Sequence, residues 1–204
     1  GLMCYTQLQT SMDAHEITQL LERSAQSGSH LDKTLSDILE FANLESGTMI
    51  LSPEAVQVPD LFEGVSQMYA HAASRKGSRI SIELPEDVLV PIKADAKLID
   101  LLLQKLVENA VEFGPASSDV IIRGVLSDGA WTLSVSDEGP GIDVQHHEVI
   151  FESFRQVDSG HTRSHPGVGL GLAIVEDIIN SHGGTIQLSK SSYNGLQVKI
   201  SLPL

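Results

Sequence analysis

The sequence is poor in cysteine and in positive charge, and it contains no long apolar run. Cys4 is the single cysteine among 204 residues, which excludes an internal disulfide and suits a reducing compartment. Lysine and arginine number 13 against 27 acidic residues, giving a net charge of −14. Broad nucleic-acid binding is therefore not expected, because it requires a basic surface. No apolar stretch approaches the roughly 18 residues of a membrane span, and no secretory leader is visible.

Two glycine-rich segments are present instead. Residues 166–172 read PGVGLGL and place Gly167, Gly169 and Gly171 at alternate positions before an apolar periodic segment. Glycine lets backbone amides approach a ligand closely, and a helix N-terminus adds oriented N–H groups with a partial positive charge. This segment predicts a phosphate-binding loop that opens a helix. The other segment, DEGPG at 137–141, follows a strand-like run.

Apolar periodicity predicts the order of helices and strands. Leu2, Tyr5 and Leu8 are expected to close a helix that starts before residue 1. A long helix from about His15 to Gly47 carries apolar residues at heptad-like spacing, which is typical of a hairpin that dimerises into a four-helix bundle. The remaining elements are expected at Asp60–Lys76 (helix), Arg79–Leu84 (strand), Ala96–Phe113 (helix), Val120–Val125 and Trp131–Val135 (strands), Val168–His182 (helix), and Thr185–Ser189 with Leu196–Leu202 (a strand pair).

The helix predicted over 96–113 is strongly amphipathic. Opposite its apolar stripe, Lys105, Asn109 and Glu112 lie four and seven residues apart on a separate polar stripe. The segment from Ile142 to Pro166 is long, with a short apolar anchor that includes Phe151 and Phe154. Loops of this length are uncommon in a compact domain unless they act as lids or are disordered.

Four motifs in a fixed order resemble the ATP-binding catalytic domain of sensor histidine kinases, which belongs to the GHKL superfamily. They are an Asn-Ala helix followed by DEGPG, then FESFRQVDSG, then GVGLGLAIV and a closing HGGTI. The resemblance covers about Pro59 to Leu204, and the lid is most similar to that of hybrid kinases. In addition, SGSHLDKTLSDILEFANLESG resembles the second helix of the family's dimerisation and phosphotransfer hairpin.

The resemblance implies an α+β fold. A two-layer α/β sandwich, with a mixed β-sheet and helices on one face, is expected after a partial antiparallel helical hairpin. The implied domains are a hairpin at residues 1–52 with a truncated first helix, and an ATP-binding catalytic domain at residues 53–204.

The same resemblance implies roles for individual residues. Asp137 matches the family's adenine-reading aspartate, and Asn109 matches the asparagine that chelates Mg²⁺, whose octahedral shell takes amide, phosphate and water oxygens. The other residues implied to line the ATP site are Gly139, Gly141, Ile142, Phe154, Arg155, Arg163, Gly167, Val168, Gly169, Leu170, Gly171 and Leu172.

Structural alternatives exist for several of these residues. Asp137, close to Gly139, is also able simply to cap a turn, and Asn109 is compatible with a solvated helix face. Arg155 and Arg163 are either phosphate-binding cations or plain lid charges. Phe151 and Phe154 are expected to anchor the lid on the core, while Lys93 and Arg123 are expected at the surface.

Two positions depart from the family pattern. Lys105 stands where the family commonly has a second asparagine, and Glu112 stands where it often has a lysine or arginine. A cation at residue 105 would repel Mg²⁺ but is able to contact a phosphate. Lys105 and Glu112 are therefore candidate catalytic residues, and kinase activity is a separate question from nucleotide binding.

The leading hypothesis is an ATP-dependent protein-histidine kinase that passes phosphate to a response-regulator receiver domain. The phosphoacceptor histidine is expected upstream of residue 1. His15 is expected to be a surface residue near the hairpin turn, and His30 a residue on a helix face. The chain is expected to be a cytoplasmic core that forms a homodimer through its hairpin. Any membrane attachment would come from segments outside the sequence. One alternative is a catalytically degenerate nucleotide-binding module that regulates another kinase by dimerising with it. Another is a gyrase- or chaperone-type ATPase, against which Lys105 argues because those enzymes place a catalytic glutamate there.

Overall fold

The computed structural model describes residues 14–46, 51–85, 91–127, 129–156 and 168–203. Residues 1–39 and 40–204 form two compact units. Helix α2 (Ala14–Glu45) runs through this division, so its last turns belong to the larger unit. The predicted long helix is confirmed, whereas the helix end expected near Leu2–Leu8 and the stop at Gly47 lie outside the described residues. The predicted domain boundary at residues 52 and 53 stays a prediction.

Within the smaller unit, α2 exposes several large apolar side chains. They are Ile17, Leu20, Leu21, Leu31, Leu35, Ile38 and Leu39. Single exposed apolar residues are ordinary, but a repeated set along one helix is characteristic of an association surface.

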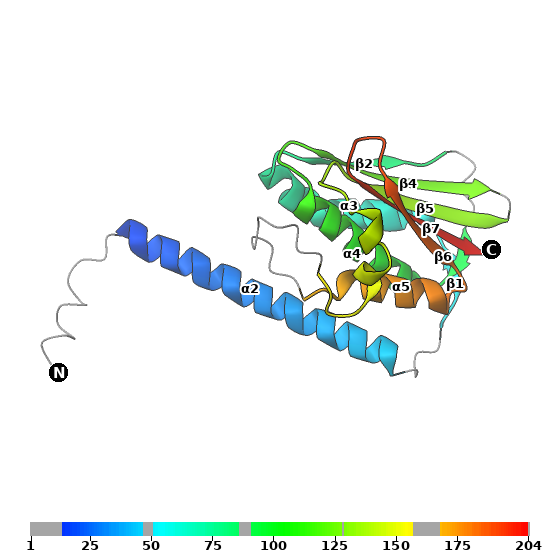
Figure 1. Ribbon diagram of the computed structural model, residues 1–204, viewed down its shortest axis with the longest axis horizontal. Coiled ribbons are helices and arrows are strands. Elements are labelled where there is room, and N and C mark those ends of the chain that lie inside the picture. Colours follow the sequence, from blue (N-terminus) through cyan, green and yellow to red (C-terminus); the bar gives the residue numbers. More distant parts are fainter. Residues whose placement is uncertain (1–13, 47–50, 86–90, 128, 157–167, 204) are drawn as a thin grey trace, which may run out of the picture. The chain divides into compact units, whose positions relative to one another are not determined.

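A five-stranded sheet forms one layer of the larger unit (Figure 1). Its order is β2-β4-β5-β7-β6, in which β2 runs parallel to β4 and every other pair is antiparallel. The strands are β2 (Arg79–Glu83), β4 (Asp119–Ser127), β5 (Ala130–Ser136), β6 (Thr185–Lys190) and β7 (Leu196–Pro203). A separate antiparallel pair joins β1 (Glu54–Val56) to β3 (Ile92–Ala94).

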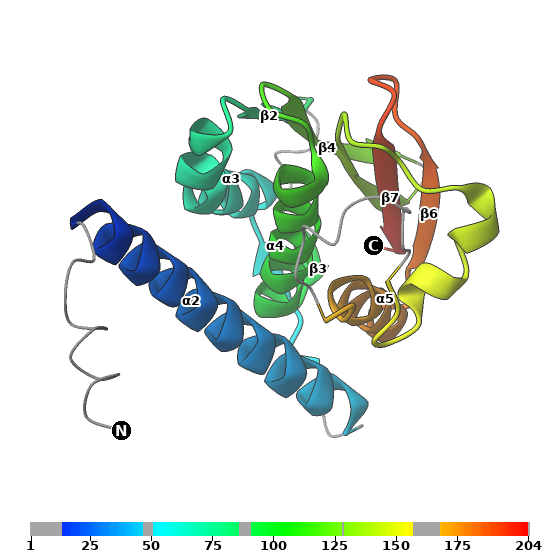
Figure 2. The same cartoon turned by 60° about the vertical axis from the view of Figure 1, so that its left-hand side comes forward.

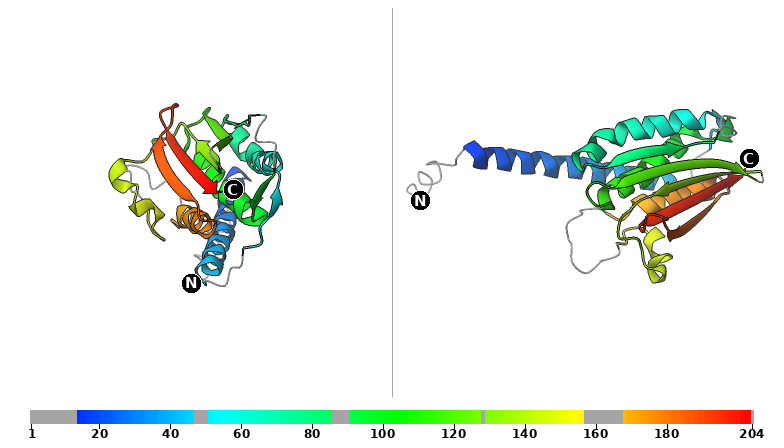
Figure 3. Two further views of the ribbon diagram at one scale, coloured as in Figure 1. Left: turned by 90° about the vertical axis from the view of Figure 1, so that its right-hand side faces the viewer. Right: turned by 90° about the horizontal axis from the view of Figure 1, so that it is seen from above.

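Three helices form the second layer. Helices α3 (Val58–Arg75), α4 (Ala96–Phe113) and α5 (Gly171–Ser181) cover one face of the sheet, with α4 between the other two (Figure 2). Figure 3 shows the same layers from two further sides. The short helices η2 (Val144–His146) and η3 (Val149–Phe151) precede the segment 157–167. The predicted α+β fold with a mixed sheet and helices on one face is therefore confirmed.

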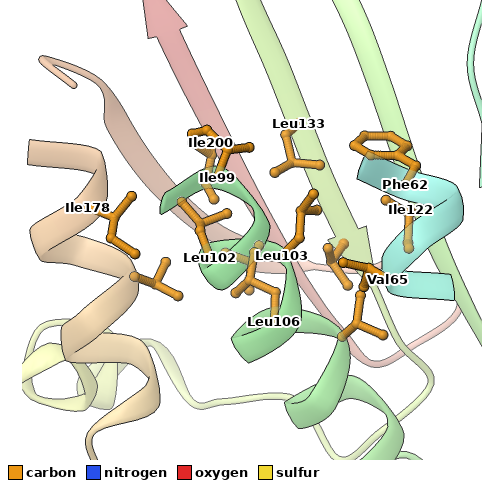
Figure 4. Close-up of a cluster of buried hydrophobic side chains, with 14 of the residues drawn as sticks. Phe62, Val65, Ile99, Leu102, Leu103, Leu106, Ile122, Leu133, Ile178 and Ile200 are labelled. Atoms are coloured by element: carbon orange, nitrogen blue, oxygen red, sulfur yellow. The ribbon is translucent and has the colours of Figure 1, made fainter. Parts of the chain in front are cut away.

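The core lies between the two layers. Figure 4 shows side chains of α3, α4 and α5 meeting those of the sheet, with Phe62, Val65, Ile99, Leu102, Leu103, Leu106, Ile122, Leu133, Ile178 and Ile200 labelled. Because successive strand residues point to opposite faces, the other face carries the register neighbours Arg123, Ser134 and Lys199. Arg123 and Lys199 are exposed there, as predicted for Arg123.

Helix α4 is fixed at both ends. Asp95 caps its start, where Oδ1 accepts hydrogen bonds from the backbone N–H groups of Lys97 (3.2 Å) and Leu98 (3.3 Å). At the other end, Nζ of Lys76 donates to the carbonyls of Val111, Glu112 and Gly114 at 2.8, 2.7 and 2.9 Å. A cation at a helix C-terminus satisfies the last carbonyls and complements the helix dipole.

The bounds of α4 are those predicted, residue for residue. The predicted start of the last helix at Val168 is wrong, because Gly169 has φ +74° and cannot be part of a right-handed helix; α5 begins at Gly171. Strands β1 and β3 were not predicted. Each has three residues, too few to display the alternation that marks a strand.

Replacing Lys76 with methionine is expected to lower the free energy of unfolding by about 1.5–3 kcal/mol, because three carbonyls at the end of α4 lose a charged donor. Urea unfolding measures the change. Lys97→Met, at an exposed position of the same helix, is the matched control. Equal losses in the two variants would contradict the capping role.

Candidate functional site

Asp137 lies directly after β5 and is held rigidly by the turn between β6 and β7. Its carboxylate oxygen Oδ1 accepts hydrogen bonds from the backbone N–H groups of Gly139 (2.7 Å) and Leu196 (3.0 Å). Its own N–H donates to the Leu196 carbonyl at 2.9 Å, and its carbonyl accepts from Oγ of Ser191 at 2.7 Å. Among the described residues, the hydrogen bonds to the carboxylate all involve Oδ1, which leaves Oδ2 to accept from a ligand.

Burial raises the pKa of Asp137 above its ordinary value, and the hydrogen bonds from Leu196 and Gly139 oppose this rise. The residue is 9% exposed. No cation of the described residues is recorded as pairing with this carboxylate. A carboxylate that is buried in spite of this cost is typical of a functional site.

Glycines surround Asp137 because no side chain fits there. A Cβ on Gly139 would lie 2.9 Å from Oδ1 of Asp137 and 3.2 Å from the Phe113 carbonyl at the end of α4. Gly141 adopts φ +68° beside the Gly195 carbonyl, and the carbonyl of Ile142 contacts Nε2 of His147 at 3.1 Å. Gly139 therefore lies next to Asp137 and Gly141 lies next to Gly195, whereas the contact recorded for Ile142 is with His147.

Two residues that hold Asp137 were missed by the sequence analysis. A Cβ on Gly195 would lie only 2.2 Å from the Asp137 carbonyl, and Oγ of Ser191 donates to that carbonyl. Both lie in the turn before β7, far along the chain from Asp137. The Asn194-Gly195 pair was the available signal, since Asn-Gly is typical of a tight turn.

The glycine loop lies against α4. The carbonyl of Gly169 accepts a hydrogen bond from the Phe154 N–H at 3.0 Å, and a Cβ on Gly169 would lie 2.4 Å from the Arg155 carbonyl. A Cβ on Gly171 would lie 3.7 Å from Nδ2 of Asn109 and 3.9 Å from its Oδ1. The start of α5 and the predicted metal-binding asparagine thus face each other.

The other predicted loop residues contribute mainly their backbone. Leu170 is 1% exposed, and Val168 and Leu172 pack against the core. Leu170 occupies the N-cap position of α5 and provides no capping side chain. The first N–H groups of a helix have no partner within it, so those of α5 are suited to an anion. Gly167 and Arg163 lie outside the described residues.

The start of the lid differs from expectation. Phe154 does not pack into the core; it is 60% exposed and meets the ring of Phe41 edge-on with 6.0 Å between centroids. The reason is its backbone, since φ +64° turns this residue outward while its N–H binds Gly169. Ile150 is the buried anchor of this segment. Arg155 is exposed and pairs with Glu152 at 2.8 Å.

Lys105 belongs to the polar stripe that the spacing predicted on α4, and the structure shows that it is buried. It is 8% exposed, and its Nζ lies 2.8 Å from Oε2 of Glu40 near the end of α2. The ion pair allows the lysine to be buried, because its charge is neutralised. Glu112 is half-buried on α4, and its carbonyl accepts from Lys76.

The groups of the site follow α4 from one end to the other. Phe113, at the C-terminal end of α4, lies next to Gly139 and therefore close to Asp137. One helical turn earlier, Asn109 lies next to Gly171. Lys105 lies one further turn toward the start of the helix. Along this row lie a buried carboxylate, then the first amides of α5 with the side-chain amide of Asn109, and finally the ammonium group of Lys105, which contacts Glu40. This order matches a base followed by phosphates.

A metal ion here would depend on the ligand for most of its donors. Within the described part of the chain, no group of three or more His, Cys, Asp and Glu side chains is arranged to hold a metal. Asn109 provides an amide oxygen of the kind that Mg²⁺ accepts, and Mg²⁺ ordinarily keeps waters and phosphate oxygens as its other ligands. The residues present fit a nucleotide-bound Mg²⁺ rather than a resident metal.

The fold and this site define a class of ATP-binding protein. A family model described as histidine kinase-, DNA gyrase B-, and HSP90-like ATPase matches residues 94–204, and the chain belongs to this family. It has the catalytic domain of sensor histidine kinases, the enzymes of two-component signalling, preceded by a helix.

Individual relatives agree with this assignment. The chain is 34% identical to hybrid signal transduction histidine kinase D of Dictyostelium discoideum, over 90% of this chain and 12% of that protein. It is 30% identical to sensor histidine kinase CpxA of Escherichia coli, over 90% of this chain and 39% of that protein. The structure of full-length ShkA with AMPPNP matches with a TM-score of 0.78 and 29% identity, covering 95% of this chain and 40% of that chain.

The chain spans well under half the length of these curated relatives, 12% and 39% of the two named. Within the described residues, no helix has the length and apolar character needed to cross a membrane.

Replacing Asp137 with asparagine should separate stability from binding. The amide oxygen is still able to accept the two backbone hydrogen bonds, but the negative charge is lost. Because the folded-state pKa of Asp137 is raised, wild type loses stability as the pH rises from about 4 through that pKa. Asp137→Asn has no such titration, so its stability relative to wild type should rise as the pH increases from about 4 through the folded-state pKa of Asp137. Its affinity for ATP should be lower than that of wild type by about tenfold or more.

Urea unfolding at a series of pH values, together with calorimetric titration of ATP at neutral pH, measures both effects. A stability difference that does not change with pH would contradict the buried-carboxylate argument, and unchanged ATP affinity would exclude Asp137 from the nucleotide site.

Proposed function

We propose that this chain is the ATP-binding core of a two-component sensor histidine kinase that transfers the γ-phosphoryl group of ATP to a histidine. From there the phosphoryl group passes to an aspartate of a response-regulator receiver domain. The observation that carries the proposal is the row along α4, in which Asp137 stands at one end and the glycine loop faces Asn109 further along.

Each group has a distinct role in this proposal. Oδ2 of Asp137 accepts a hydrogen bond from the exocyclic amine of adenine, and the first amides of α5, with Gly169 before them, bind phosphate oxygens. Asn109 provides one oxygen to Mg²⁺, which supplies charge neutralisation at the phosphates when it is bound. Phosphoryl transfer depends chiefly on positioning and on charge neutralisation, and these residues supply the positioning.

The hairpin and its partners belong to the same proposal. The exposed apolar side chains of α2 support a homodimer through the helical hairpin at residues 1–52, joined to a catalytic domain at residues 53–204. The acceptor histidine comes from the first hairpin helix rather than from His15, and the core works in the cytoplasm.

Arg155 is exposed beside the loop and becomes a phosphate-binding cation if it leaves Glu152.

A second candidate is supported by Lys105. Lys105 stands where an asparagine ligand to the metal was expected on α4, and its ammonium group is buried against Glu40. Both features favour a regulatory module that binds nucleotide without transferring phosphate. The two candidates share the nucleotide site and differ in phosphoryl transfer alone.

The test combines binding with transfer. ATP is titrated by calorimetry with and without Mg²⁺, and label from γ-labelled ATP is followed onto an intact hairpin supplied in trans. The proposal predicts binding that Mg²⁺ strengthens, followed by acid-labile label on the hairpin. Asn109→Ala should weaken Mg·ATP binding by at least about tenfold, because even the loss of a residue that only supports a metal ligand costs about that much, and Asn109 is proposed to bind the metal directly. The exposed Asn180→Ala is the control.

Binding without transfer would support the regulatory module instead. Absence of ATP binding would contradict both candidates. Label that appears on this chain and disappears in His15→Ala would show that the acceptor has been misplaced.

A further inference from the structure

Two neighbouring residues near the end of α2 contact two elements of the proposed nucleotide site. Glu40 forms the ion pair with Lys105 on α4, and the ring of Phe41 packs edge-on against Phe154 at the start of the lid. Both belong to the larger unit. Phe41 and the nearby Leu44 also pack against the hydrophobic core. The last turns of α2 are therefore attached to the two elements that a nucleotide must engage.

The contact between Glu40 and Lys105 is close but incompletely formed. The atoms lie 2.8 Å apart and Oε2 is buried, yet among the described residues this oxygen takes part in no hydrogen bond. A buried ion pair gains little net energy unless hydrogen bonds complete it, because both charges lose their hydration. A better-placed anion would therefore be able to replace Glu40.

Lys105 is placed to meet such an anion. It lies one helical turn beyond Asn109, on the side away from Asp137. In the proposed site, a nucleotide with its base at Asp137 and its first phosphates at Gly171 would extend its terminal phosphate toward this turn. An ammonium group is a compact point charge on a flexible stem, and it binds phosphate oxygens without needing one fixed geometry.

The other charged side chains at this end of α2 repel those of α5, which favours separation of the two helices. The pKa of Asp177 on α5 is raised by burial and then by the charge of Glu45, so these two carboxylates lie close enough to repel. Glu176 beside it also has a raised pKa, from burial and from Asp177. With Glu40 displaced, the attraction between Lys105 and Glu40 no longer offsets this repulsion.

We propose that the terminal phosphates of a nucleoside triphosphate compete with the Glu40 carboxylate for Lys105, so that triphosphate binding weakens the attachment of α2 to α4. This inference rests on the proposed nucleotide site. Lys105 thereby distinguishes triphosphate from monophosphate, and Glu40 acts as a built-in competitor.

Calorimetric titration of ATP, ADP and AMP against Glu40→Gln tests the competition. Removal of the competing carboxylate should tighten ATP binding by about fivefold or more, the lower end of typical coupling between sites. The affinity for AMP should stay within about twofold of the wild-type value, because a monophosphate would not reach Lys105 and effects at sites that are not in contact are nearly independent. Unchanged or weaker ATP binding, or equal tightening of all three nucleotides, would overturn the proposal.

Lys105→Gln supplies the second arm. It should weaken ATP binding and leave AMP binding unchanged, and adding Glu40→Gln to it should have no further effect on ATP. Lys97→Gln, at an exposed position of the same helix, is the matched control. An effect of Glu40→Gln that persists in the Lys105→Gln background would show that the two residues act separately.

Folding and nucleotide binding are checked independently. Thermal unfolding of each variant reports whether it folds. If Lys105→Gln does not fold, a double variant that exchanges the two charges, Glu40→Lys with Lys105→Glu, replaces it. This variant keeps the ion pair but places the negative charge on α4. ATP should then bind to it more weakly than AMP. If the wild type binds none of the three nucleotides, the proposed function fails rather than the competition.

Discussion

The burial of α4 between α3, α5 and the sheet is the constraint on which the rest of the structure depends. Its apolar side chains fill the core, Asp95 caps its start, and Lys76 binds the carbonyls at its end. A helix held in this way has no freedom to rotate or slide, because interiors are close-packed. The groups on its remaining side therefore keep fixed positions relative to the Asp137 loop and the start of α5.

Asp137 shows the energetic cost of such a site. Burial disfavours its charge, and the protein offsets part of this with two backbone hydrogen bonds to one oxygen. Gly139 and Gly195 allow the chain to close around it, since a side chain at either position would collide with the carboxylate or its carbonyl. The same enclosure that destabilises the charge holds the carboxylate in one position, with both recorded hydrogen bonds on Oδ1.

Much of this was predictable from the sequence, and the failures have physical reasons. Helix α4, Asp137 and the glycine loop have local signals: a long 3.6-residue period and glycines in fixed order. Strands β1 and β3 are too short to show a period. Gly195 and the Lys105–Glu40 pair depend on residues brought together from distant parts of the chain, which spacing does not reveal. The roles of Asn109, Asp137 and the glycines in ATP binding stay predictions.

Hydrogen exchange followed by mass spectrometry, with and without saturating ATP, tests the central claim most directly. ATP lying along α4 from Asp137 to the start of α5 predicts slower exchange of the backbone amides at 137–141 and 169–172, with no change in β2 at the far edge of the sheet. The account would be contradicted if calorimetry reports ATP binding while neither glycine segment exchanges more slowly, or if slower exchange is confined to other segments.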